Sequence, residues 1–101
     1  MQIVVRGANG LGGGYWSDGT YTAHGTRNGA TEFVRDGGGI LYFDADYWKL
    51  YPEKKIRPGA TGWNFSQKGS KSGPPLGSWE KAKRKSGETD RDYSSLTLSR
   101  G

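Results

Sequence analysis

Few side chains in this sequence could perform acid–base, nucleophilic or metal chemistry. His24 is the only histidine among the 101 residues, and cysteine is absent. Zinc would therefore have to bind carboxylates, which structural zinc sites rarely use. No serine has a histidine close in sequence that would activate its hydroxyl as a nucleophile. We therefore expect no catalytic residue and no zinc site, and an exposed strand position for His24.

Asp44 and Asp46 stand two residues apart, like the first ligands of a calcium-binding loop. A loop that begins at Asp44 would need glutamate at its twelfth position, where the chain has Lys55. Aspartate is also a common turn residue, because its short side chain bonds to the nearby backbone. The spacing predicts a turn, and no metal or cofactor is expected.

A glycine-rich segment, residues 7–14, invites comparison with phosphate-binding loops. A dinucleotide fingerprint starting at Gly10 would need glycine where Tyr15 stands. A nucleotide P-loop starting at Gly7 would need lysine where Gly13 stands. No helix is predicted to follow and offer its N-terminus to a phosphate. The segment is predicted to be a flexible connection.

Binding through aromatic and basic side chains is the chemistry that remains. The four Trp, six Tyr and three Phe exceed what a core of this size needs, so some rings should be exposed. The net charge is +5, and residues 51–101 carry eleven basic against five acidic side chains. The candidate binding surface combines exposed rings with this basic half: Tyr15, Trp16, Tyr47, Tyr51, Lys54, Lys55, Arg57, Lys83, Arg84 and Lys85. Peptides, sugars and single-stranded bases all use such surfaces.

A hairpin over residues 40–51 is the element around which the chain is predicted to fold. Two runs of aromatic and branched residues, which favour strands, flank a short polar break. Side chains alternate along a strand, so Trp48 and Leu50 should share one face. We predict that Trp48 is buried, with Phe33 and Tyr42 nearby.

Short strands and frequent turns continue on both sides of this hairpin. Asn28-Gly29 predicts a two-residue type I′ turn between strands at 20–24 and 31–35. Further short strands are predicted at 3–5, 63–65, near Trp79 and at 96–98, the last paired with 3–5. Loops are predicted at 53–62, 67–77 and 83–92. The sequence thus predicts one all-β domain over residues 1–101, a small barrel or sandwich of seven to eight short antiparallel strands with a central meander.

The order of these landmarks resembles a short aromatic all-β module that recurs in multidomain proteins of unicellular eukaryotes and algae. The landmarks are Gly19-x-Tyr21, Gly25-x-x-Asn28-Gly29, Phe33, Gly39-Ile40-x-Tyr42, Trp48-x-Leu50, Trp63-x-x-Ser66, Pro74-Pro75-x-Gly77-x-Trp79 and Leu96-x-Leu98. The module stands beside ankyrin, kinase or ubiquitin-ligase domains and has no catalytic residues attached to it, so the resemblance carries no function over to this chain. The basic insertions at 53–62 and 80–92 depart from its pattern.

The functional expectation is a non-catalytic interaction module that binds or scaffolds proteins. The alternatives are a binder of single-stranded RNA or DNA, which the basic half favours, and a carbohydrate-binding module. The only apolar run at the N-terminus, residues 3–5, is too short for a signal peptide or a membrane span. We therefore expect an intracellular, cytoplasmic protein without membrane insertion. The oligomeric state does not follow from the sequence.

Overall fold

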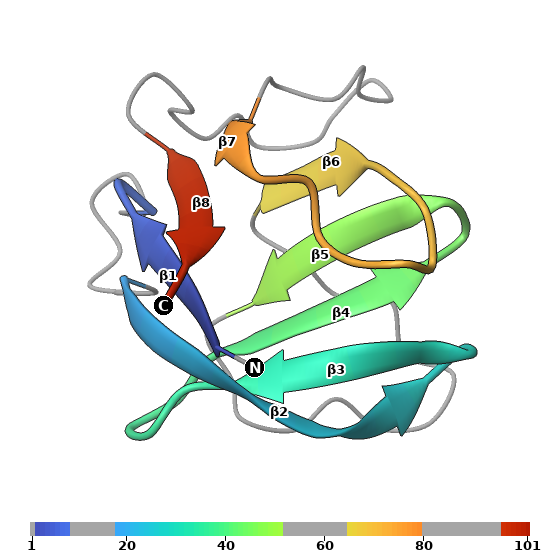
Figure 1. Ribbon diagram of the computed structural model, residues 1–101, viewed down its shortest axis with the longest axis horizontal. Helices are drawn as coiled ribbons and strands as arrows, with labels where there is room; N and C mark the ends of the chain where they lie inside the picture. Colours follow the sequence, from blue (N-terminus) through green and yellow to red (C-terminus); the bar gives the residue numbers. More distant parts are fainter. Residues whose placement is uncertain (1, 9–17, 52–64, 80–95) are drawn as a thin grey trace, which may run out of the picture.

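The computed structural model describes residues 2–8, 18–51, 65–79 and 96–101, with Phe65 described through its backbone alone. In these residues the chain forms a single eight-stranded antiparallel sheet and no helix (Figure 1). The strands are β1 (Gln2–Arg6), β2 (Gly19–Arg27), β3 (Ala30–Val34), β4 (Ile40–Asp44), β5 (Tyr47–Tyr51), β6 (Phe65–Lys68), β7 (Gly77–Ser78) and β8 (Thr97–Arg100).

The sheet has the order β6-β5-β4-β3-β2-β1-β8-β7 and curls into a half-barrel (Figure 1). Strands β1 to β6 are neighbours in chain order, and the four strands β2 to β5 within this run are the predicted meander. Strand β8 returns to pair with β1, as predicted, and Leu98 lies opposite Val5. The predicted all-β class is therefore confirmed.

Tight turns with left-handed backbone connect the central strands. Asn28 and Gly29 join β2 to β3 with φ angles of 54° and 82°, which is the predicted positive-φ turn. Ala45 and Asp46 join β4 to β5 with φ angles of 50° and 70°. Aspartate adopts this backbone region more readily than most residues. The polar break in the central hairpin is thus a turn, as its composition predicts.

The hydrophobic core lies on the inner face of the sheet, defined here as the face that carries Trp48. Trp48 is completely buried, and its ring centroid lies 5.6 Å from that of Phe43 and 6.3 Å from that of Phe33. Buried side chains from six further positions on the strands complete this layer: Ile3, Val5, Tyr21, Leu41, Leu50 and Leu98. The prediction that Trp48 is buried beside Phe33 is confirmed.

Tyr42 lies on the other, outer face, so the prediction that it neighbours Trp48 is wrong. It is the register partner of Lys49 and packs with Ile40 in a separate apolar cluster. The physical reason is the strand's own alternation: Leu41 and Phe43 face the inner core, so the residue between them must face away. Tyr42 is nevertheless fully buried.

The bounds of the strands after β5 differ from the prediction. Gln67 and Lys68, predicted in a loop, extend β6 and pair with Trp48 and Tyr47 of β5. Trp79, predicted to open a strand, instead follows β7 directly, and its backbone N–H donates to the Leu96 carbonyl at 3.0 Å. Pairing with β5 overrides the polar composition of β6, since backbone hydrogen bonds do not depend on the side chain. The predicted loops at 53–62 and 83–92 lie outside the described residues.

Candidate functional site

The segment that connects β6 to β7, residues 69–76, is held against the core by two tryptophan indoles. Trp48 Nε1 donates to the Ser70 carbonyl at 2.8 Å, and Trp79 Nε1 donates to the Pro75 carbonyl at 2.9 Å. Both tryptophans are buried, so each indole N–H needs a hydrogen-bond acceptor, and each finds one in a carbonyl of this β6–β7 segment. The segment is therefore held in place by hydrogen bonds from two buried side chains.

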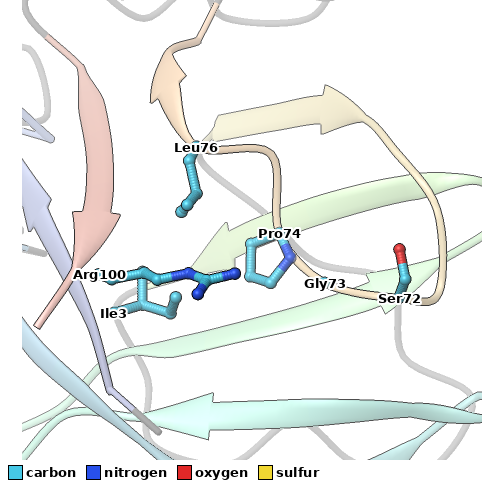
Figure 2. A pocket seen from close by; sticks show the side chains of 6 residues that line it. All are labelled: Ile3, Ser72, Gly73, Pro74, Leu76 and Arg100. Carbon is cyan, nitrogen blue, oxygen red and sulfur yellow. The ribbon is translucent and has the colours of Figure 1, made fainter.

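A pocket of about 190 Å³ opens between the β6–β7 segment and the β1–β8 pair (Figure 2). Its lining consists of Ile3, Ser72, Gly73, Pro74, Leu76 and Arg100. Ile3 belongs to the fully buried core, whereas Leu76 is 47% exposed at the pocket. Leu76 is the only large hydrophobic side chain that is exposed in the described part of the chain. A single exposed leucine is ordinary on a protein surface, but this one lines a hollow that reaches the core.

The volume of the pocket limits what it can bind. A cavity of about 150 Å³ holds one benzene molecule, whereas sites for drug-sized ligands and cofactors measure about 300–1,000 Å³. The pocket thus suits a group the size of one amino-acid side chain. Its lining offers aliphatic carbon and the Arg100 guanidinium, whereas the Ser72 hydroxyl is already hydrogen-bonded to the Ser70 hydroxyl at 2.6 Å.

A second cluster of charged side chains lies on the outer face, around Tyr42. Arg27 Nε pairs with Glu32 Oε1 at 3.1 Å, and Lys49 Nζ pairs with Asp44 Oδ2 at 2.8 Å. The Arg27 guanidinium also lies 5.8 Å from the centroid of the Tyr42 ring. Burial, together with the Asp44 carboxylate, raises the pKa of the Tyr42 hydroxyl above its ordinary value. Each charge in this outer polar cluster already has an opposite partner, so the cluster stabilises the fold and offers no open site.

The described residues can be compared with the metal site and the phosphate-binding loop that the sequence brings to mind. No three His, Asp or Glu side chains lie there in an arrangement that could hold a metal ion. His24 is exposed on β2. The backbone N–H groups of Gly7 and Ala8, at the start of the glycine-rich segment, donate to the Asp18 carboxylate at 3.1 and 2.6 Å. These two donors are therefore already used within the protein.

The structure describes two of the ten predicted binding residues. Tyr47 and Tyr51 both lie on β5 and are half-buried, and Tyr51 packs against the outer cluster of Ile40 and Tyr42. Neither lies at the pocket. The other eight lie outside the described residues: Tyr15, Trp16, Lys54, Lys55, Arg57, Lys83, Arg84 and Lys85. For all ten, the assignment to a binding surface stays a prediction.

Sequence reasoning missed the pocket residues, although a weak signal for one of them exists. The alternation that places Leu96 and Leu98 inward, continued by two residues, places Arg100 on the same face. The sequence around Pro74 and Leu76 is polar and gives no sign of a pocket, because only the fold brings these residues to Ile3.

No protein-family model, curated protein or solved structure matches this chain.

The described residues also contain no helix with the length and hydrophobicity needed to cross a lipid bilayer.

Proposed function

We propose that this chain is a protein-binding module without catalytic activity, which docks an extended segment of a partner protein at the pocket beside Leu76. The observation that carries the proposal is the pocket itself, a hollow of side-chain size whose lining includes the exposed Leu76 and the core residue Ile3. Peptide recognition commonly uses such a hollow for one anchoring side chain.

The charge of the chain indicates what kind of segment would dock. The net charge is +5, and the guanidinium of Arg100 lies in the pocket lining. Complementary charge favours encounter with an acidic partner and disfavours a basic one.

The alternatives with nucleic acids or sugars need exposed rings on which bases or sugars stack. In the described part of the chain the exposed large hydrophobic side chain is a leucine, and Tyr47 and Tyr51 are half-buried. Aliphatic walls around a guanidinium suit a peptide side chain better than a base. The described surface therefore favours a protein partner.

Selection from random-peptide phage libraries tests the proposal and does not require the partner to be identified first. Two libraries are needed, one that presents the peptide internally and one that presents a free C-terminus. Enriched peptides are then synthesised, and their affinities for the parent chain, Leu76→Ala and Thr26→Ala are measured by fluorescence polarisation. Thr26 is exposed on β2, away from the pocket lining, so its truncation is the matched control.

We expect peptides whose affinity falls at least about tenfold in Leu76→Ala and stays unchanged in Thr26→Ala, since loss of an anchoring contact costs upward of about 1 kcal/mol. The proposal is wrong if neither library yields a peptide whose binding depends on Leu76.

A further inference from the structure

Arg100 continues the inward-facing row of β8 to the end of the half-barrel. It is the register partner of Ile3, as Leu98 is of Val5, and register partners point to the same face of a sheet. Ile3, Val5 and Leu98 are buried, whereas Arg100 is exposed. The inner apolar row therefore ends in a guanidinium. Figure 2 shows the Arg100 side chain extending above Ile3 toward Pro74, with Leu76 pointing at it from the opposite wall.

No carboxylate in the described residues pairs with this guanidinium. Two ion pairs between described residues, Arg27–Glu32 and Lys49–Asp44, lie on the outer face and do not involve Arg100. An arginine offers five N–H donors in a rigid plane that matches the two oxygens of a carboxylate. In the pocket the Arg100 side chain lies beside the apolar side chains of Ile3, Pro74 and Leu76. A carboxylate that packs between them and the guanidinium would lose contact with water, and would then gain more than it would at an open surface.

The size of the pocket decides which carboxylate fits. A glutamate side chain has a short apolar stem and a terminal carboxylate, which together match aliphatic walls around a guanidinium. A C-terminal residue carries its carboxylate on the Cα, so its backbone would have to enter together with its side chain. A hollow of about 190 Å³ is the size of one amino-acid side chain. It therefore suits a glutamate side chain better than a C-terminal residue that enters with its backbone.

We propose that the pocket is selective for a glutamate side chain within an extended partner segment, with the stem against Leu76 and Pro74 and the carboxylate on Arg100. This inference rests on the proposed function, because it names the residue that the docked segment inserts. Arg100 is then the specificity-determining residue, and Leu76 contributes affinity that does not depend on charge.

The test uses the peptides from the internal library whose binding depends on Leu76. Each peptide is synthesised in three forms: with its glutamate intact, with this glutamate changed to glutamine, and with an amidated in place of a free C-terminus. Each peptide is titrated against the parent chain, Arg100→Gln, Arg100→Lys and Arg6→Gln. Arg6 is exposed on β1 and on the opposite face from Ile3, so Arg6→Gln removes the same charge away from the pocket. Melting curves establish that each variant is folded.

We expect the glutamate-to-glutamine peptide and the Arg100→Gln variant each to lose at least about tenfold in affinity. The two changes combined should lose little more than either alone, since both remove the same contact. The affinity of Arg100→Lys should lie between those of the parent chain and Arg100→Gln, because lysine keeps the charge but not the planar guanidinium. Arg6→Gln and amidation should stay within about twofold.

Three results would overturn the inference. They are Leu76-dependent peptides that share no glutamate, an Arg100→Gln variant that binds as tightly as the parent chain, and loss of binding on amidation, which identifies a terminal carboxylate as the ligand. In each of these cases the proposed function still stands, because binding depends on Leu76. If no peptide depends on Leu76, the proposed function fails and this inference fails with it.

Discussion

Single side chains in this protein serve both the core and the candidate site, and Trp48 is the clearest case. Its ring packs on Phe33 and Phe43, and its indole N–H holds Ser70 at the start of the pocket wall. A fully buried tryptophan contributes more apolar area than any other residue type, so its loss leaves a large cavity.

Trp48→Ala is expected to lower the free energy of unfolding by about 3–5 kcal/mol. That is a large share of the roughly 5–15 kcal/mol typical of whole domains. Urea unfolding followed by circular dichroism measures the change. A variant that unfolds at nearly the parent's urea concentration would contradict the buried position of Trp48.

Tyr42 makes stability depend on pH in the alkaline range. Its folded-state pKa is raised, chiefly by burial and next by the Asp44 carboxylate, above the value of about 10 for an unfolded chain. The hydroxyl thus binds its proton more tightly in the folded state. The stability it contributes is fully present below about pH 10 and is lost as the pH rises further.

We therefore expect the stability difference between the parent chain and Tyr42→Phe to fall by up to about 1.4 kcal/mol per pH unit above about pH 10. Urea unfolding of both proteins between about pH 8 and pH 11, a range that spans the ordinary tyrosine pKa, gives this difference. If the two stability curves run parallel over that range, Tyr42 ionises equally well in the folded and unfolded states.

At the scale of elements, the β6–β7 segment is the part that shapes the pocket. A Cβ added at Gly69 would lie 2.9 Å from Trp48 Cδ1 and 2.9 Å from Pro75 Cγ, both in rigid rings. A Cβ added at Gly73, in the same segment, would meet nothing within 4 Å. The two glycines therefore form a matched pair, one packed on the core and the other open.

Gly69→Ala is expected to destabilise the protein by about 1–3 kcal/mol, because overpacking forces the segment away from Trp48. Gly73→Ala should change stability by less than about 0.5 kcal/mol. Thermal and urea unfolding of both variants provide the comparison. Equal effects of the two substitutions would mean that the segment does not pack on Trp48.

The same elements show how far sequence reasoning reaches. The alternation of residues 40–51 and the Asn28-Gly29 dipeptide predict strands, faces and turns, because these depend on neighbours in the chain. The prediction for Tyr42 fails because the register of the hairpin places Phe43, and not Tyr42, opposite Trp48. Lys68 belongs to β6 although its neighbours are polar, because the partner strand supplies the hydrogen bonds. The pocket joins residues from β1, β8 and the β6–β7 segment, whose proximity depends on the closure of the whole sheet.

At the scale of the whole molecule, the curled sheet brings Ile3 of the first strand and Arg100 of the last strand to the β6–β7 segment (Figure 2). The half-barrel is filled by side chains along most of its inner face, and the pocket lies where this row ends at Arg100. Mouths of β-barrels are common positions for ligand sites, since the core there meets the surface.

The net charge of +5 should produce only weak and nonspecific binding of nucleic acid. We expect a fluorescein-labelled single-stranded oligonucleotide to bind with a Kd of about 10⁻⁴ M or weaker at roughly 150 mM salt, as any basic surface would give. Lys83, Arg84 and Lys85 changed together to alanine should weaken this binding further at low salt. Sub-micromolar binding at the same physiological salt that is lost in Trp16→Ala would instead support a nucleic-acid function.

The most direct test of the account is an NMR titration of the ¹⁵N-labelled chain with a Leu76-dependent peptide. Amide resonances respond to a ligand at the positions it touches, whatever the affinity contributed by each contact. We predict that the largest shift changes fall on Ser72, Gly73 and Leu76 and, across the pocket, on Ile3 and Arg100. Largest changes on β5 around Tyr47 and Tyr51, or at residues 83–85, would place the binding surface elsewhere and contradict the assignment of the pocket.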